Sequence, residues 1–378
     1  MNHWKETVEV LSRVSALRAS GNGHRAALAT VIHTVGSAYR RPGAKLLVFD
    51  TGETIGSVSG GCLEADVREV ARAVMDSGQP VLRRYDTRDE TDAISSLGLG
   101  CRGIVDVFVQ PATAGTLASL LETLQGLLAG DAPIAVATLV DAAKGGRPAG
   151  EMMAVSLSSN DLLPFSVGGT LGEATLDEQL LATLGDLGHC AASGMKDLGT
   201  HRVFIDFWRP PPHLVVCGAG SDARPIVTYA ANAGFRVTVL DHREGLLQQC
   251  DFPDAIQLAR ALPDDPAIAL PAGDRALAVV KTHSLTHDRA WVRRFLELGL
   301  PYVGVLGPKE RTDRILSDIG AETTWPGCRG RVFGPVGLDL GADGPQQIAI
   351  SIVAELLAFV SHREPRHLWQ RDAPIHAG

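Results

Sequence analysis

Cysteine is scarce in this chain, and no two cysteines stand in a paired motif. Six occur among 378 residues, at positions 62, 101, 190, 217, 250 and 328, and no CxxC is present. Scattered cysteines of this kind are typical of a protein in a reducing compartment and not of a disulfide framework. The spacing also disfavours a structural zinc site, which needs paired ligands. We therefore expect a cytoplasmic protein with free thiols.

Long tracts of one charge or of apolar residues are absent as well. Lys+Arg number 35 and Asp+Glu 43, which gives a formal net charge of −8, and no basic run stands out. Nucleic acid is therefore not expected as a partner. The longest apolar run, 348–360, contains Ser351 and Glu355 and is too short to span a bilayer. The first residues are polar and unlike a secretory signal. We therefore expect neither a signal peptide nor a membrane span.

The clearest boundary in the chain is a run of three prolines. They occupy 210–212 and follow Arg209, and consecutive prolines hold the backbone extended and stiff. A chain of 378 residues has room for two or three domains. We predict an N-terminal mixed α/β domain over 1–208, a linker at 209–212 and a C-terminal domain over 213–378.

The C-terminal domain opens with a dinucleotide-binding fingerprint. An apolar strand at 213–217 leads into Gly218, Gly220 and Ala223 in a G-x-G-x-x-A pattern, and the next strand ends in Asp241. Where this pattern binds a dinucleotide, the glycines admit the pyrophosphate and the acid binds the ribose 2′-hydroxyl. It predicts a Rossmann-type parallel sheet, and an NAD-like ligand held by Gly218, Gly220 and Asp241. The fold can also keep its turn and bind something else.

In the N-terminal domain, a glycine loop runs directly into a cysteine and a helix. Ser59, Gly60 and Gly61 precede Cys62, and apolar residues at helical spacing cover 63–76. Free backbone N–H groups and the positive end of the helix dipole gather at such a start, which favours anions and thiolates. One interpretation is a reactive or ligand-binding Cys62 beside an anion cradle. The other is a small buried residue behind a glycine turn.

Further motifs occur in order along the chain. In the N-terminal domain they are Gly36-Ser37 with Arg41-Pro42-Gly43-Ala44, Gly56-Ser57-Val58-Ser59-Gly60-Gly61-Cys62-Leu63-Glu64 and Gly100-Cys101-Arg102-Gly103. In the C-terminal domain they are Cys217-Gly218-Ala219-Gly220, Thr282-His283 with Asp288, Tyr302-Val303-Gly304-Val305-Leu306-Gly307 and Pro335-Val336-Gly337-Leu338-Asp339-Leu340-Gly341-Ala342. Together they resemble the xanthine dehydrogenase accessory (XdhC/CoxI) family over nearly the whole chain.

The resemblance implies a maturation factor for molybdenum hydroxylases. Proteins of this kind bind molybdenum cofactor, assist its sulfuration by a cysteine desulfurase, and deliver it to the apo-enzyme. They are often homodimers with an N-terminal cofactor-linked domain and a C-terminal Rossmann domain. The chain is then a cofactor-handling chaperone more than a turnover enzyme.

The chemistry of the candidate residues agrees with this expectation, because a molybdopterin carries a phosphate and a sulfur-bound metal. The 59–61 loop, the helix start and the two arginines Arg40 and Arg41 suit the phosphate. A soft thiolate at Cys62 suits a thiophilic metal or a persulfide carrier. Cys101, in the second glycine loop, is the other candidate thiol.

Two alternatives stay open at the level of sequence. One is an NAD(P)-dependent oxidoreductase whose N-terminal domain presents the substrate, although no Ser-Tyr-Lys or His-Asp arrangement for hydride transfer stands out. The other is a nucleotide-sensing scaffold without chemistry. Equilibrium binding separates the three hypotheses, which predict affinity for molybdenum cofactor, for NAD(P)H, or for neither.

Overall fold

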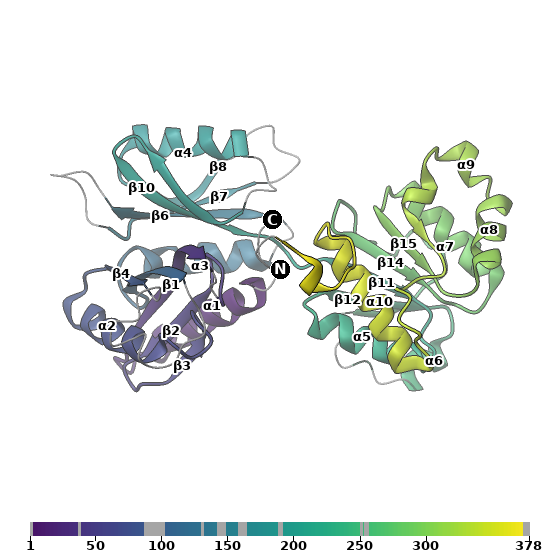
Figure 1. Ribbon diagram of the computed structural model, residues 1–378, viewed down its shortest axis with the longest axis horizontal. Coiled ribbons are helices and arrows are strands. Elements are labelled where there is room, and N and C mark those ends of the chain that lie inside the picture. Colours follow the sequence, from purple (N-terminus) through teal and green to yellow (C-terminus); the bar gives the residue numbers. More distant parts are fainter. Residues whose placement is uncertain are drawn as a thin grey trace. The chain divides into compact units, whose positions relative to one another are not determined.

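The structure is a computed structural model that describes residues 3–36, 39–86, 103–129, 132–141, 149–157, 165–187, 192–249, 252 and 257–372. The chain divides into two compact units, and the division falls between Pro210 and Pro211, inside the proline run. Figure 1 shows the helices and strands of both units. The predicted fold class, a mixed α/β domain followed by a Rossmann-type parallel sheet, is confirmed.

Unit 1 contains two five-stranded antiparallel sheets with equivalent topology. The first has the strand order β3-β2-β1-β5-β4 and the second β8-β7-β6-β10-β9. The strands of the first sheet are β1 (Ala26–Gly36), β2 (Lys45–Phe49), β3 (Thr54–Gly56), β4 (Val81–Asp86) and β5 (Gly103–Pro111). Those of the second are β6 (Ile134–Asp141), β7 (Met152–Ser156), β8 (Phe165–Gly169), β9 (Gly194–Leu198) and β10 (His201–Trp208).

In the described part of unit 1, four helices complete the layers. They are α1 (His3–Ser20), α2 (Glu64–Ser77), α3 (Gly115–Ala129) and α4 (Ala174–Leu187). α1 and α3 add their apolar faces to a core shared by both sheets, as Leu11 and Leu124 do, while α2 and α4 cover the outer faces. Because both faces of each sheet are covered, β2 and β7 are buried along their whole length. Each sheet is therefore preceded by one helix and covered by another.

Unit 2 is a doubly wound sheet of six parallel strands in the order β13-β12-β11-β14-β15-β16. α5 and α10 pack on one face, and α7 and α8 on the other. The strands are β11 (His213–Cys217), β12 (Arg236–Asp241), β13 (Gln257–Arg260), β14 (Ala276–Val280), β15 (Tyr302–Val305) and β16 (Val332–Phe333). The helices are α5 (Ala223–Asn232), α6 (Glu244–Gln249), α7 (Leu285–Glu297), α8 (Lys309–Asp318), α9 (Ala321–Thr324) and α10 (Pro345–Val360), with 3₁₀ turns at Cys328–Gly330 and Leu368–Gln370.

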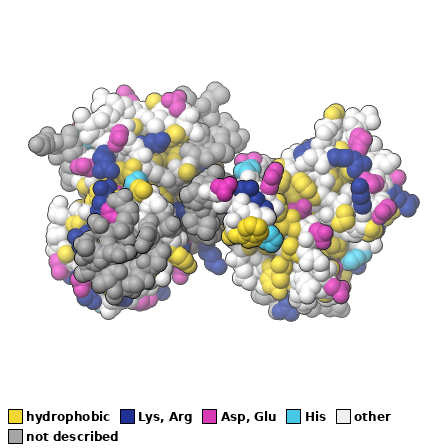
Figure 2. Space-filling model, viewed as in Figure 1, with side chains coloured by type: hydrophobic (Ala, Val, Ile, Leu, Met, Phe, Trp, Pro, Cys, Tyr) yellow, Lys and Arg dark blue, Asp and Glu magenta, His cyan; other side chains and the backbone are white. Residues whose placement is uncertain are grey.

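The strand order of unit 2 reverses between β11 and β14, so their carboxyl ends border a ligand crevice of the kind found in open α/β sheets. Cys217, at the end of β11, is fully buried. No helix in the described part of the chain is long and apolar enough to cross a membrane. On the face shown in Figure 2, acidic and basic side chains are interspersed over both units.

Candidate functional site

The loop of residues 57–63, between β3 and α2, is held by one carboxylate. Glu64, the first residue of α2, accepts hydrogen bonds from the hydroxyls of Ser57 and Ser59 at 2.8 and 2.5 Å. It also accepts from the backbone N–H groups of Val58, Ser59, Gly61 and Leu63, at distances between 2.9 and 3.3 Å. Burial alone raises the pKa of Glu64, but the bonds from Ser59 and Ser57 outweigh it and lower this pKa to about 2.

The predicted anion cradle therefore exists, and the protein's own carboxylate fills it. Gly60 and Gly61 have φ angles of +79° and +119°, which a side chain would strain. A Cβ atom on Gly60 would also lie 2.7 Å from Cδ1 of Tyr39, so the exposed Tyr39 ring rests directly on the loop. The glycines let the loop fold around Glu64 and let Tyr39 cover it.

Cys62 lies just before the start of α2, as the sequence predicted. Its side chain is half-buried and packs against the hydrophobic cluster between the first sheet and α2, which includes Val58 and Leu63. Within the described residues, no three His, Cys, Asp or Glu side chains are placed to hold a metal ion.

Arg40 meets the same loop through Glu6 of α1. Glu6 pairs with Nη2 of Arg40 and accepts from the backbone N–H of Ser57 at 3.3 Å. The Nε atom of Arg40 is buried and has no hydrogen-bond partner among the described residues. Arg41, next in the chain, is exposed. One edge of the loop thus carries a guanidinium with an unused donor.

The structure brings several of the predicted residues of unit 1 into one neighbourhood, namely Arg40, Ser59, Gly60, Gly61 and Cys62. Cys101 lies outside the described residues. Sequence reasoning missed Glu6 and Glu64, which organise this neighbourhood. The signal for Glu64 was an acid at the first position of a helix behind a loop rich in serine and glycine, where the backbone and hydroxyl donors need an acceptor.

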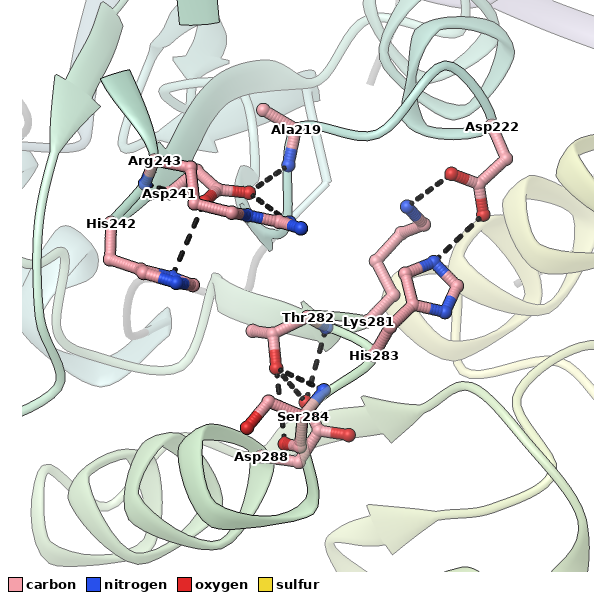
Figure 3. Close-up of polar contacts among 10 residues, drawn as sticks. All are labelled: Ala219, Asp222, Asp241, His242, Arg243, Lys281, Thr282, His283, Ser284 and Asp288. Atoms are coloured by element: carbon pink, nitrogen blue, oxygen red, sulfur yellow. Dashed lines mark hydrogen bonds and ion pairs between the residues drawn. The ribbon is translucent and has the colours of Figure 1, made fainter. Parts of the chain in front are cut away.

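In unit 2, the fingerprint loop after β11 also binds a carboxylate of the chain (Figure 3). Asp241, at the end of β12, accepts from the backbone N–H of Ala219 at 2.7 Å and from three nitrogens of Arg243, each at 2.9 Å. Burial raises its pKa, and the bonds from Arg243 and Ala219 outweigh this and lower it to about 2. Gly218 has a φ of +118°, and a Cβ there would overlap the carbonyl oxygen of Lys281.

A second cluster lies at the end of β14. Nζ of the fully buried Lys281 donates to Asp222 at 2.8 Å, and Nε2 of His283 lies 3.5 Å from the same carboxylate. Beside it, Asp288 accepts from the N–H and hydroxyl of Thr282, at 3.1 and 2.6 Å, and from Arg311. Asp222, Lys281 and His283 face one another across the carboxyl ends of β11 and β14 in Figure 3.

These features define a two-unit protein with a carboxylate-bound glycine loop before Cys62 and a Rossmann-type second unit. Residues 19–86 match the family described as the XdhC and CoxI family, and residues 214–356 match the XdhC Rossmann domain. The chain belongs to the XdhC and CoxI family.

Two relatives and one solved structure extend these matches. A Bacillus subtilis (strain 168) protein, named as a probable subunit of xanthine dehydrogenase, is 32% identical over 337 residues, which is 88% of this chain and 92% of that protein. "Uncharacterized protein YqeB" of Escherichia coli (strain K12) is 28% identical over 60% of this chain and 43% of its own length. A crystal structure described as a xanthine dehydrogenase from Bacillus halodurans superimposes with a TM-score of 0.73 at 27% identity, covering 94% of this chain and 96% of that one.

Proposed function

We propose that this protein serves the maturation of a molybdenum hydroxylase of the xanthine dehydrogenase type. In this role it binds molybdenum cofactor, assists its sulfuration and inserts it into the apo-enzyme. Membership of the XdhC and CoxI family supports the proposal. So does the Bacillus subtilis relative, whose name refers to xanthine dehydrogenase. The alternative of an NAD(P)-dependent oxidoreductase is not favoured.

The observation that carries the proposal is the position of Cys62. The thiol is half-exposed on a loop whose backbone is fixed from within by Glu64. A cysteine there is not needed for the turn, since serine suits a helix start at least as well. A soft thiolate is a ligand for thiophilic metals and an acceptor for sulfur.

The residues around Cys62 fit a molybdopterin in kind. Because Glu64 already accepts from four N–H groups of the 57–63 loop, the phosphate is assigned to Arg40 and Arg41, and Arg40 has a buried Nε with no partner among the described residues. When bound, the cofactor supplies a thiophilic metal and a phosphate. Cys62 would hold the metal side, and Ser59, Gly60 and Gly61 would shape the approach to it.

The proposal includes three partners. A cysteine desulfurase supplies the sulfur, an apo molybdenum hydroxylase receives the cofactor, and a second copy of the chain forms a homodimer. Arg40 and Cys62 lie in unit 1, so the proposal predicts that unit 1 determines cofactor loading.

The test is co-expression with cofactor synthesis, followed by molybdenum and pterin analysis of the purified protein. Wild type should carry both in a fixed ratio. Cys62→Ser should stay folded and lose most of the molybdenum, because the hydroxyl is a harder and far less acidic ligand. Cys217→Ser is the matched control, because Cys217 is fully buried in unit 2 and its loss should leave loading per folded molecule unchanged.

Loading of Cys62→Ser to the wild-type level, with a client activated at the wild-type rate, would assign Cys62 to packing. Cys101, Arg40 and Arg41 would then be the next candidates for contact with the cofactor. A wild-type protein without molybdenum or pterin under the same conditions would contradict the cofactor-binding role itself.

A further inference from the structure

The fingerprint loop of unit 2 leaves a space where dinucleotide-binding folds admit a pyrophosphate. In those folds, the second glycine lets the phosphates approach the backbone, and the acid at the end of the next strand binds the ribose. Here Gly220 is the second glycine and Asp241 is the acid. The carboxylate of Asp222 fills the space at Gly220, and the carboxylate of Asp241 is already hydrogen-bonded within the chain.

Asp222 fills the space above Gly220. A Cβ atom on Gly220 would lie 2.8 Å from Oδ1 of Asp222, so the carboxylate occupies the volume that the missing side chain leaves. Asp222 is the N-cap residue of α5, yet its side chain makes no cap hydrogen bond. It turns instead toward Lys281 and His283 (Figure 3).

Lys281 makes this arrangement stable. Its side chain is 0% exposed, and its Nζ lies 2.8 Å from Asp222. A buried ammonium needs an anionic partner close by. Burial raises the pKa of Asp222, and the contact with Lys281 outweighs this and lowers it. The lysine therefore holds a negative charge beside Gly220.

His283 is the exposed member of this cluster. It has a φ of +61°, which is uncommon outside glycine, and its side chain is 61% exposed. Nε2 lies 3.5 Å from Oδ2 of Asp222. An anion in the place of the Asp222 carboxylate would therefore contact the buried Nζ of Lys281 and the exposed ring of His283.

Asp241 is committed in the same way. Its side chain is 1% exposed, and both oxygens are used by Ala219 and Arg243. Binding a ribose hydroxyl would require the carboxylate to give up the bond that shapes the fingerprint loop. The space at Gly220 and the carboxylate of Asp241, which recognise the ligand in dinucleotide-binding folds, are thus both occupied by contacts within unit 2.

We propose that Asp222 is an intramolecular substitute for a pyrophosphate, and that it closes a latent phosphate site formed by Gly220, Lys281 and His283. The wild-type crevice accordingly takes no dinucleotide. This proposal takes the place of the NAD-like ligand that the fingerprint led us to expect. Loss of the Asp222 charge opens the site to phosphoanhydrides. This inference does not depend on the cofactor role of unit 1.

The test is calorimetric titration of the full chain with inorganic pyrophosphate and, separately, with NADH. Asp222→Asn should bind pyrophosphate at least about tenfold more tightly than wild type, because it removes a like charge from the site. NADH binding by this variant as well would identify a dinucleotide site, and pyrophosphate binding alone a simple phosphate site. Either result supports the substitute role of Asp222.

Two further variants make the test specific. Asp222→Asn with Lys281→Met should lose the gain, because the ammonium that receives the phosphate is absent. Asp318→Asn, which removes a surface partner of Arg289 in the same unit, should behave as wild type. If Asp222→Asn does not fold, Asp222→Ser takes its place, because the smaller side chain admits water to Nζ of Lys281. The thermal unfolding of this variant is then measured with and without pyrophosphate.

Three results would overturn the proposal. Wild type binding NADH as tightly as Asp222→Asn would mean that the crevice is open. No gain in any Asp222 variant would mean that no latent site exists. If the gain in pyrophosphate affinity persists when Lys281 is also replaced, it would come from a general change of charge and not from a site at Lys281.

Discussion

The two halves of unit 1 have the same plan but differ at their centre and at their loops. Each half consists of a helix, three strands, a helix and two strands, and the sheet orders correspond strand by strand. The register agrees as well: Thr30 pairs with Lys45 and Phe108, and Thr138 pairs with Met152 and Phe204. Unit 1 is therefore a structural repeat, and each residue of one half provides a control for its counterpart.

At the centre, equivalent residues make one charged and one neutral contact between the sheets. Nζ of Lys45 donates to Asp206 at 2.6 Å. In the counterpart contact, Nε2 of Gln110 lies 3.7 Å from the sulfur of Met152. Asp206 is also bonded by Ser193 and Trp208, so the ion pair is buried and well satisfied. Equivalent positions of the two halves thus carry a charged pair in one contact and a neutral pair in the other.

At the loops, the difference concerns length and a thiol. The loop between strand and helix covers 57–63 in the first half and 170–173 in the second. Both are closed by an acid of the following helix, Glu64 in one and Asp177 in the other. Only the longer loop carries a cysteine. Both halves thus have a loop closed by an acid of the following helix, and of these two loops only the one in the first half has the candidate cysteine site.

The largest effect is expected from breaking the central ion pair. Lys45→Met leaves the Asp206 carboxylate buried without its cation, and should lower the free energy of unfolding by about 3–5 kcal/mol. Urea denaturation followed by circular dichroism measures the change.

The double variant Lys45→Met with Asp206→Gln copies the contact of the other half. It should recover most of the lost stability, since a neutral pair of similar volume often replaces a buried ion pair at little cost. A double variant as unstable as the single one would show that the two central contacts are not equivalent.

The next effect concerns the closing acid of the longer loop. Glu64→Gln keeps the shape but replaces one of the two acceptor oxygens with an NH₂ donor, so three of the six donors lose their acceptor. We expect a loss of about 1–2 kcal/mol, reduced by partial exposure to solvent. Alkylation of Cys62, followed by peptide mapping, should become faster as the loop opens. Asp177→Asn is the matched variant: it closes a loop without a thiol, and should leave the alkylation rate of Cys62 unchanged.

The same carboxylate gives a pH dependence. The pKa of Glu64 falls from an ordinary 4.5 to about 2 on folding, so its contribution to stability is present above pH 4.5 and is lost as the pH falls toward 2. The stability difference between wild type and Glu64→Gln should therefore shrink from pH 6 to pH 3. An unchanged difference would mean that the hydrogen bonds do not depend on ionisation.

The sequence predicts unit 2 well because its pattern is local: an apolar strand, a glycine turn, a helix and a second strand lie within 213–241. It places Cys62 correctly for the same reason. The partners of the two glycine loops escaped prediction, because Glu64 and Asp222 look like ordinary helix-start acids until the loop donors and Lys281 are placed around them.

The repeat in unit 1 was also missed, because its halves share few identical residues. The signal was present as Ala29-Thr30 against Ala137-Thr138, and as buried helix leucines before each. The central pair joins residues 161 positions apart. No local pattern predicts such a contact, and its counterpart is identified only from the strand register of the two sheets.

The smallest effect on stability is expected at the thiol itself. Cys62 is half-buried, so Cys62→Ser should change the free energy of unfolding by no more than about 0.5 kcal/mol. Cys217→Ser, in a fully buried strand, should cost about 1–3 kcal/mol, because the new hydroxyl is taken out of water. Thermal unfolding of both variants measures the contrast. A large loss in Cys62→Ser would make this cysteine a packing residue, and would remove the difference in function that separates the two halves of unit 1.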